Sequence, residues 1–177
     1  MKIIVDAMGG DNAPAAVVQG ALAAAEEYHA GIALVGRGDE ILAAVHAAGI
    51  AELPAGVEIC HADQVIGMCD NPANAVKEKK DSSMAVGLGM LKRGEGDAFV
   101  SAGSTGALLA GATMLTKRIR GIRRAALTLV IPTEAGRAVL VDCGANAECT
   151  PEFLLQFAFM GSYYAERVLG KPEPRVG

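Results

Sequence analysis

Apolar and polar positions follow two rhythms along the first part of the chain, and these predict strands and helices in turn. Short apolar runs at residues 2–6, 31–36 and 57–60 predict buried strands. Between them, apolar residues recur every three or four positions, which predicts helices over residues 14–29 and 39–49. This order predicts βαβ units and a parallel sheet with helices on both faces.

The rhythm breaks at residues 63–81, where we expect an extended loop with a short helix, of the kind that often serves function. A helix is expected over residues 82–93, capped by Asp81 or Ser82. The next strand is predicted at residues 97–101, followed by a turn of small residues and an apolar helix that ends near Thr116.

The last part of the chain predicts a hairpin and one long helix. Residues 126–132 and 137–142 read as strands joined by a turn at 133–136, so we expect a mixed sheet. The helix over residues 151–169 has apolar positions nearly all round, which predicts burial on more than one side. It is either a core helix or a dimer interface.

Composition narrows the class of protein. The 177 residues suit one domain, and 51% apolar with only 4% aromatic residues predicts a core of Ala, Val, Leu, Ile and Met. A net charge of −4 argues against general nucleic-acid binding, and no apolar run is long enough to span a membrane. The short apolar start does not read as a signal peptide, so we expect a cytoplasmic protein. The four cysteines lack zinc spacing, and we expect reduced, mostly buried thiols.

The turn after the strand at residues 97–101 predicts an anion site. It offers hydroxyls and glycine backbone at the start of a helix, where unpaired N–H groups favour phosphate. The residues expected to hold phosphate are Ser101, Gly103, Ser104, Thr105 and Gly106. The alternative is a tight strand-to-helix turn that needs glycine only for close packing.

Two further predicted strand ends resemble this one. The first is the loop of Asp6, Gly9, Gly10, Asp11 and Asn12, and the other runs from Asp142 to Asn146. The carboxyl ends of parallel strands share one edge of a sheet, so we expect the three turns to line one ligand crevice.

Other chemistries are weaker. The dinucleotide fingerprint G-x-G-x-x-G is missing, so a nicotinamide cofactor is disfavoured and no cofactor is expected. Cys143 lacks an evident base and is expected to be structural rather than nucleophilic. Asp6, Asp11 and Asp142 could bind a metal, although a helix cap is the preferred role for Asp11 and no metal is expected. A basic cluster at a helix end could dock an acidic partner: Lys117, Arg118, Arg120, Arg123 and Arg124.

Several motifs together resemble the phosphate acyltransferase of bacterial phospholipid synthesis, the PlsX family. They are Val5-Asp-Ala-Met-Gly-Gly-Asp11, Lys79-Lys-Asp-Ser-Ser-Met84, Val100-Ser-Ala-Gly-Ser-Thr-Gly-Ala-Leu108, Gly121-Ile-Arg-Arg124, Asp142-Cys-Gly-Ala-Asn146 and Pro174-Arg-Val-Gly177. They fall in the family's order along the whole chain. Ser104 stands where the family usually has Asn, Ala125 where Pro is usual, and Cys143 where Val is common.

The resemblance implies transfer of a fatty acyl group from acyl carrier protein to inorganic phosphate. It implies a three-layer α/β/α fold like that of phosphotransacetylases and the isocitrate dehydrogenase group, usually in a homodimer. Residues 1–177 would form a single α/β domain, the N-terminal part of a longer catalytic domain. Peripheral membrane association and hand-off to a membrane glycerol-3-phosphate acyltransferase are also implied.

The residues fit that chemistry, because phosphate must be held and an oxyanion stabilised. We expect catalytic roles for Asp6, Asn146 and Asp142, and docking of acyl carrier protein on the basic cluster. The loop residues Gly9 to Asn12, with Lys80 and Ser82, would complete the site. Two alternatives stay open: a coenzyme A-dependent phosphate acetyl- or butyryltransferase, and a non-catalytic module that binds phosphate or acyl carrier protein.

Overall fold

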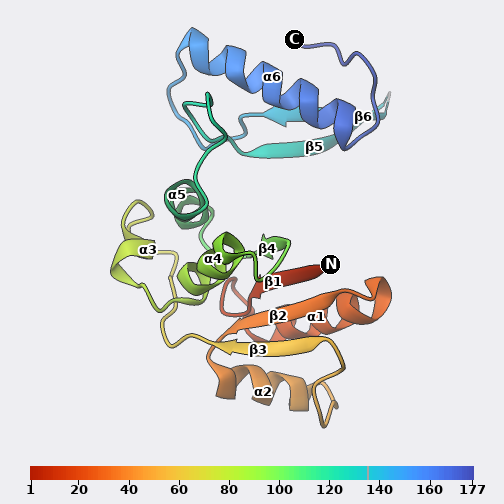
Figure 1. The fold of residues 1–177 in the computed structure, drawn as a ribbon, viewed down its shortest axis with the longest axis vertical. Coiled ribbons are helices and arrows are strands. Elements are labelled where there is room, and N and C mark those ends of the chain that lie inside the picture. The colour runs from red at the N-terminus through yellow and green to blue at the C-terminus, as the bar shows by residue number, and fades with distance from the viewer. Residues whose placement is uncertain (135) are drawn as a thin grey trace. The chain divides into compact units, whose positions relative to one another are not determined.

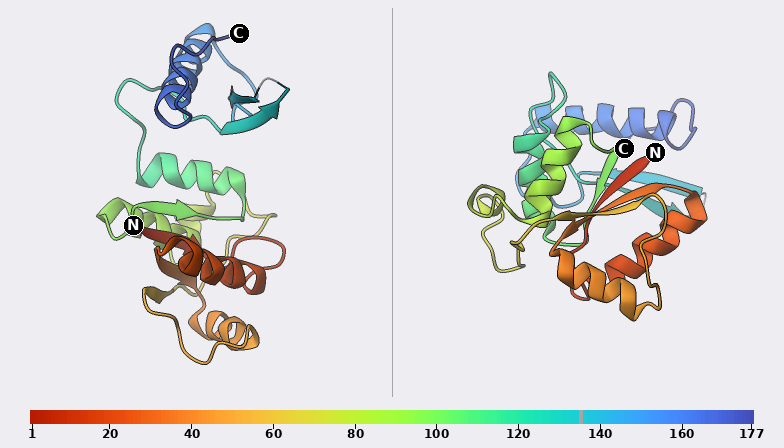
Figure 2. Two further views of the ribbon diagram at one scale, coloured as in Figure 1. Left: turned by 90° about the vertical axis from the view of Figure 1, so that its right-hand side faces the viewer. Right: turned by 60° about the horizontal axis from the view of Figure 1, so that its bottom comes forward.

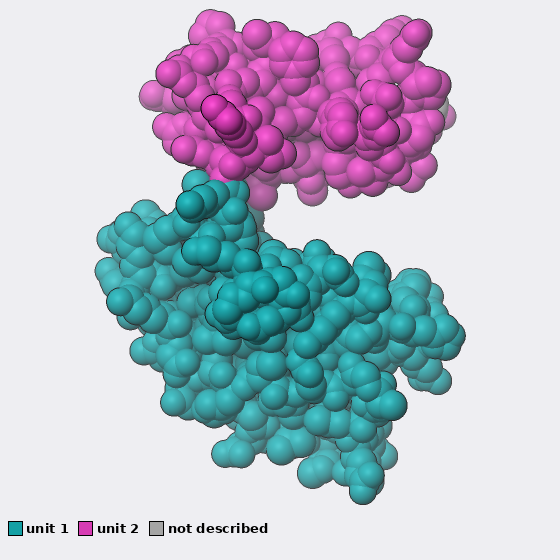
Figure 3. Space-filling view, in the orientation of Figure 1, with its two compact units in different colours: residues 1–117 teal, residues 118–177 magenta. Residues whose placement is uncertain are grey.

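The structure is a computed structural model that describes residues 1–134 and 136–177. Contacts divide the chain into two compact units, Met1–Lys117 and Arg118–Gly177, which we call unit 1 and unit 2 (Figure 3). The expected single domain therefore stays a prediction.

Unit 1 is built on a parallel sheet, as the βαβ order predicts. Its strands are β1 (Lys2–Asp6), β2 (Gly31–Gly36), β3 (Val57–His61) and β4 (Ala98–Val100). They are ordered β3-β2-β1-β4 and all neighbours are parallel (Figure 1). In this register Val5 lies between Leu34 and Val100, so β1 and β4 end side by side.

Helices cover both faces of this sheet. They are α1 (Ala15–Tyr28), α2 (Gly38–Ala47), α3 (Ala75–Glu78), α4 (Ser83–Arg93) and α5 (Thr105–Leu115). Val5 belongs to a core shared with α1 and α2, whereas its neighbour Ile4 belongs to a core shared with α4. Figure 2 shows the ribbon from two further sides. The expected three-layer α/β/α arrangement is confirmed in unit 1. Residues 63–81 form the expected long loop with the short helix α3.

Unit 2 holds the predicted hairpin, β5 (Thr128–Thr133) with β6 (Gly136–Val141), and the helix α6 (Pro151–Arg167). The hairpin is antiparallel as expected, but the prediction of one mixed sheet is wrong for the described residues. Here β5 and β6 pair with each other in a separate two-stranded sheet, and the four-stranded sheet is entirely parallel.

Helix α6 is buried along one side only, which corrects the prediction. Phe157 and Ala165 are buried, whereas Leu154 is 56% and Phe159 67% exposed. The helix packs on β6 and leaves four large apolar side chains exposed: Leu154, Leu155, Phe159 and Tyr163. The dimer-interface alternative stays a prediction. In the described part of the chain, no helix combines the length and apolar character needed to cross a membrane.

The expectation of mostly buried thiols is also wrong. Cys69 and Cys149 are exposed, and Cys60 and Cys143 are half-buried. Burial raises the pKa of the Cys60 thiol, and the nearby carboxylate of Glu58 raises it further.

Candidate functional site

An aspartate and a serine meet where β1 and β4 end. The hydroxyl of Ser101 donates to Asp6 Oδ2 over 2.7 Å, and the Met8 N–H donates to Asp6 Oδ1 over 3.2 Å. Asp6 is only 2% exposed, so its carboxylate relies on these donors instead of water. Parallel pairing of short strands brings together two residues far apart in the sequence.

Glycines let the two turns approach each other closely. A Cβ on Gly9 would lie 2.7 Å from Asp6 Oδ2 and 2.9 Å from the Gly103 nitrogen. Gly103 in turn donates its N–H to Ser101 Oγ over 3.1 Å. Gly10 has φ +110° beside Ala102, a backbone conformation that suits glycine. The loop of residues 6–12 and the turn of residues 101–106, which we call the anion turn, therefore pack tightly against each other.

Helix α5 begins within the anion turn. Ser104 is its N-cap, and its buried Oγ accepts the Ala107 N–H over 3.4 Å. Thr105 and Gly106, the first two helical residues, are exposed and their N–H groups have no acceptor within the helix. Those N–H groups and the positive end of the helix dipole can hold an anion.

The hydroxyls of the turn are not equivalent. The hydrogen of Ser101 is directed to Asp6, so in this geometry Ser101 orients the turn rather than donating to a ligand. Thr105 carries the exposed hydroxyl. Phosphate binding by these five residues stays a prediction, and the backbone N–H groups now carry it.

Other members of the predicted site lie in different settings. Asp11 and Asn12 are exposed beside Gly10, but the N-cap of α1 is Pro14, so the cap role expected of Asp11 is wrong. Ser82 is fully buried as the N-cap of α4, where its Oγ accepts the Ala85 N–H over 3.2 Å. Lys80 is exposed.

The third strand end is organised around Asp142, which follows β6. Its Oδ1 accepts the Leu127 N–H over 2.7 Å, and its Oδ2 accepts the Asn146 N–H over 2.8 Å. Burial raises the pKa of Asp142, but hydrogen bonds from Leu127, Asn146 and Gly144 outweigh it, and the pKa lies below its ordinary value. A carboxylate so held is a weak base and a strong organiser of its loop.

The side chain of Asn146 closes that loop. Its amide nitrogen donates to Ala125 O over 3.0 Å and to Asp142 Oδ2 over 3.2 Å. Both amide hydrogens are therefore engaged in this geometry. The catalytic role predicted for Asn146 stays a prediction, and donation to an oxyanion would require one of these bonds to open.

We expected the three strand ends to share one edge of the sheet, and the structure brings together the first two, at Asp6 and Ser101. Asp142 and Asn146 follow an antiparallel hairpin of unit 2, not a strand of the parallel sheet. Within the described ranges, no three His, Cys, Asp or Glu side chains gather closely enough to hold a metal ion.

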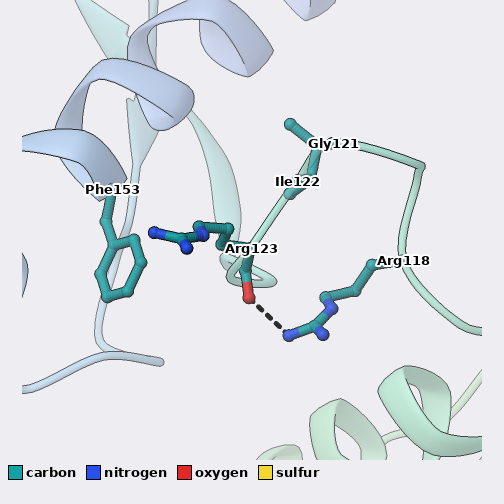
Figure 4. A pocket seen from close by; sticks show the side chains of 5 residues that line it. All are labelled: Arg118, Gly121, Ile122, Arg123 and Phe153. Carbon is teal, nitrogen blue, oxygen red and sulfur yellow. Dashed lines mark hydrogen bonds between the residues drawn. The ribbon is translucent and has the colours of Figure 1, made fainter.

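Two residues of the basic cluster, Arg118 and Arg123, line a shallow pocket of about 490 Å³ in unit 2, whereas Lys117 ends unit 1. Arg118 donates to the carbonyl oxygen of Arg123, and the side chain of Arg123 points toward the ring of Phe153 (Figure 4). Arg123 also pairs with Glu152 over 2.5 Å, and Arg124 lies 5.5 Å from the centre of the Phe153 ring. Contacts within unit 2 therefore orient the side chains of Arg118, Arg123 and Arg124.

An ion pair in the loop of residues 63–81 was not predicted from the sequence. Lys79 contacts Asp70 inside this loop, and Pro72 lies against Gly106 of the anion turn. The sequence feature that could have indicated this pair is Asp70, two residues before Pro72, with Lys79 further along the same irregular segment.

Comparisons with known proteins agree with this architecture. A phosphate acyltransferase of Thermoanaerobacterium thermosaccharolyticum is 44% identical over all of this chain and 51% of its own length. One from Desulfitobacterium hafniense (strain DSM 10664 / DCB-2) is 48% identical over all of this chain and 52% of its own length. The chain therefore spans about half the length of the curated relatives it matches.

Two phosphotransacetylases are among the solved structures with a similar α/β fold. The enzyme from Streptococcus pyogenes has a TM-score of 0.72 at 19% identity, covering 97% of this chain and 55% of that one. The EutD phosphotransacetylase from Staphylococcus aureus has a TM-score of 0.68 at 16% identity, covering 93% and 52%. The family model described as "Fatty acid synthesis protein" matches residues 1–177. The chain belongs to this fatty acid synthesis protein family.

Proposed function

We propose that the full-length protein containing this chain transfers a fatty acyl group from acyl carrier protein to inorganic phosphate. The observation that carries the proposal is the anion turn, in which the Asp6–Ser101 hydrogen bond fixes the start of α5. The family and the relatives named phosphate acyltransferase support the same reaction.

In this reaction a phosphate oxygen attacks the carbonyl carbon of the thioester. A carbon–oxygen bond forms, the carbon–sulfur bond breaks, and the thiol of the carrier leaves with a proton. The exposed N–H groups of Thr105 and Gly106 would hold the phosphate, while Asp6 keeps Ser101 and the turn in place. Direct attack needs no covalent enzyme intermediate.

Asp142 and Asn146 are proposed to act in the same reaction through the loop that they order. The hydrogen bonds from Leu127 and Asn146 keep the Asp142 carboxylate ionised, so it suits positioning better than proton transfer at neutral pH.

Acyl carrier protein is proposed to dock on the basic cluster. Arg118, Arg120 and Arg124 are exposed, and the shallow pocket beside Phe153 adds an apolar surface. Such a surface suits an acidic partner. The resemblance further implies a cytoplasmic homodimer that associates peripherally with membrane, without nucleic acid, and hands acyl phosphate to a membrane acyltransferase.

The test uses the full-length protein with palmitoyl-acyl carrier protein and inorganic phosphate, with acyl phosphate followed as its hydroxamate. We expect phosphate-dependent product. Ser101→Ala should lower kcat/KM by about tenfold or more, because the turn loses its tie to Asp6. The matched control Ser162→Ala, on α6, should leave kcat/KM unchanged.

Other outcomes separate the alternatives. Product from acetyl-coenzyme A but not from acyl carrier protein would favour a coenzyme A-dependent enzyme, an idea supported by the fold shared with phosphotransacetylases. Calorimetric binding of phosphate or carrier protein without product from either donor would favour the non-catalytic module.

A further inference from the structure

The loop of residues 63–81 is held in shape by one lysine. Lys79 Nζ donates to Val65 O over 2.9 Å and to Asp70 Oδ2 over 2.5 Å. The side chains of Lys79 and Asp70 are 34% and 30% exposed, less than those of any other ion pair among the described residues. This pair thus lies partly inside the protein, where it is screened less than a surface pair.

Asp70 makes a second contact that tightens the loop. Its Oδ2 also accepts the Gly67 N–H over 2.7 Å. The hydrogen bond from Lys79, followed by that from Gly67, holds the pKa of Asp70 below its ordinary value. One carboxylate oxygen therefore joins the start of the loop to its end.

The loop rests against α5 at two glycines. A Cβ on Gly106 would lie 2.9 Å from Pro72 Cβ, and a Cβ on Gly111 would lie 2.9 Å from Val76 Cγ2. Glycine is unfavourable inside a helix, so these contacts give a reason for its presence at both positions. Gly106 is also one of the first two residues of α5, whose N–H groups have no acceptor within the helix.

We propose that Lys79 and Asp70 are positioning residues for phosphate: they hold Pro72 against Gly106, and Pro72 limits the size of the oxyanion that reaches the start of α5. This inference rests on the proposed function. Lys79 does not serve as the cation for the bound anion, because its ammonium group is engaged by Asp70 and Val65. Loss of the pair frees the Pro72 segment and leaves the reacting groups in place.

The experiment measures steady-state kinetics of the full-length protein with phosphate and with the bulkier acceptor methylphosphonate. Lys79→Met should raise the KM for phosphate about fivefold or more with kcat within about twofold. The preference for phosphate over methylphosphonate should fall by a similar factor. Lys79→Arg, which keeps a cation at this position, should recover most of both values. The matched control Lys92→Met, at an exposed position near the end of α4, should change neither.

The variant Pro72→Gly separates the effect of the Pro72 side chain from the effect of the Lys79–Asp70 ion pair. It should reproduce the loss of preference with the Lys79–Asp70 pair intact. A fall in kcat with unchanged preference in Lys79→Met would overturn the inference, and so would wild-type kinetics in Pro72→Gly.

The activity of the wild-type protein tests the proposed function separately from the positioning inference. A wild-type protein that forms no phosphate-dependent product rejects the transferase. The positioning inference is then decided by amide hydrogen exchange of residues 102–108, which Lys79→Met should accelerate. Unchanged exchange would overturn it.

Discussion

The two units use their apolar residues differently. In unit 1 the central strands are buried on both faces, and Leu34 and Ile4 are fully inaccessible. In unit 2 every residue of β5 is exposed, and α6 buries only one side against β6. The βαβ units close around their own core, whereas unit 2 is a hairpin and a helix with much apolar surface uncovered.

The same contrast holds for their aspartates. Asp6 is the last residue of β1 and Asp142 directly follows β6, and each precedes a glycine turn. Asp6 accepts from Ser101, which directly follows β4, whereas Asp142 accepts from residues of its own hairpin and loop. One motif therefore ties distant segments together, and the other shapes a local loop.

The largest expected effect tests the difference in burial. Leu34→Ala removes side-chain volume from the closed core of unit 1 and should lower the free energy of unfolding by about 3 kcal/mol. Leu155→Ala, on the exposed face of α6, should change it by about 0.5 kcal/mol or less. Urea unfolding of the two variants measures both. Equal losses would contradict the comparison.

A second substitution tests the close approach at the Asp6 strand end. Gly9→Ala places a methyl group 2.7 Å from Asp6 Oδ2 and should cost about 2 kcal/mol of stability through overpacking. Phosphate-dependent turnover should fall as well. Gly20→Ala, where the new methyl group meets open space on α1, should instead stabilise by about 0.5 kcal/mol. A neutral Gly9→Ala variant would show that the two turns are not tightly packed.

The Asp142 strand end should be sensitive to acid. Because the folded-state pKa of Asp142 lies below its ordinary value of 3.8, its stabilising effect is complete above that pH. The effect is lost as the pH falls through the lower folded-state pKa. Hydrogen exchange of residues 125–146, compared at pH 5 and pH 3 after correction for intrinsic rates, should show this opening. In Asp142→Asn the protection should be weaker at pH 5 and should vary less between the two pH values.

The smallest effect is expected at the surface of unit 2. Arg123 and Glu152 are both more than half exposed, so Glu152→Gln should lower the free energy of unfolding by about 0.5 kcal/mol or less. High salt should reduce this difference further. A loss comparable to that of Leu34→Ala would mean that the pair is not a solvated surface contact.

Local sequence patterns were sufficient for most elements. Apolar runs and helical spacing identified β1 to β3 and α1, α2 and α4 to within a few residues, because each is stabilised by an apolar face of its own. Ser82 was one of the two cap candidates predicted for α4, with Asp81, since an N-cap is a short-range feature.

Partners distant in the sequence were harder to predict. The Ser101–Asp6 bond depends on the pairing of β1 with β4, and the Lys79–Asp70 pair depends on the path of an irregular loop. The sequence predicted that β5 and β6 pair as a hairpin, but it could not say that this hairpin forms a sheet of its own. Helix α6 was expected to be buried on several sides because apolar residues lie nearly all round it. The sequence does not show which of those sides another segment covers.

Strand β4 has a consequence for the behaviour of the chain in solution. It contributes three residues to the sheet and pairs with β1 on one side, and among the described residues its other side has no strand partner. Val100 on this strand is 53% exposed. Free backbone N–H and C=O groups along such an edge are a template for adding an extended peptide. The isolated 177-residue chain should therefore self-associate as its concentration rises, and turbidity would report it before any loss of helix.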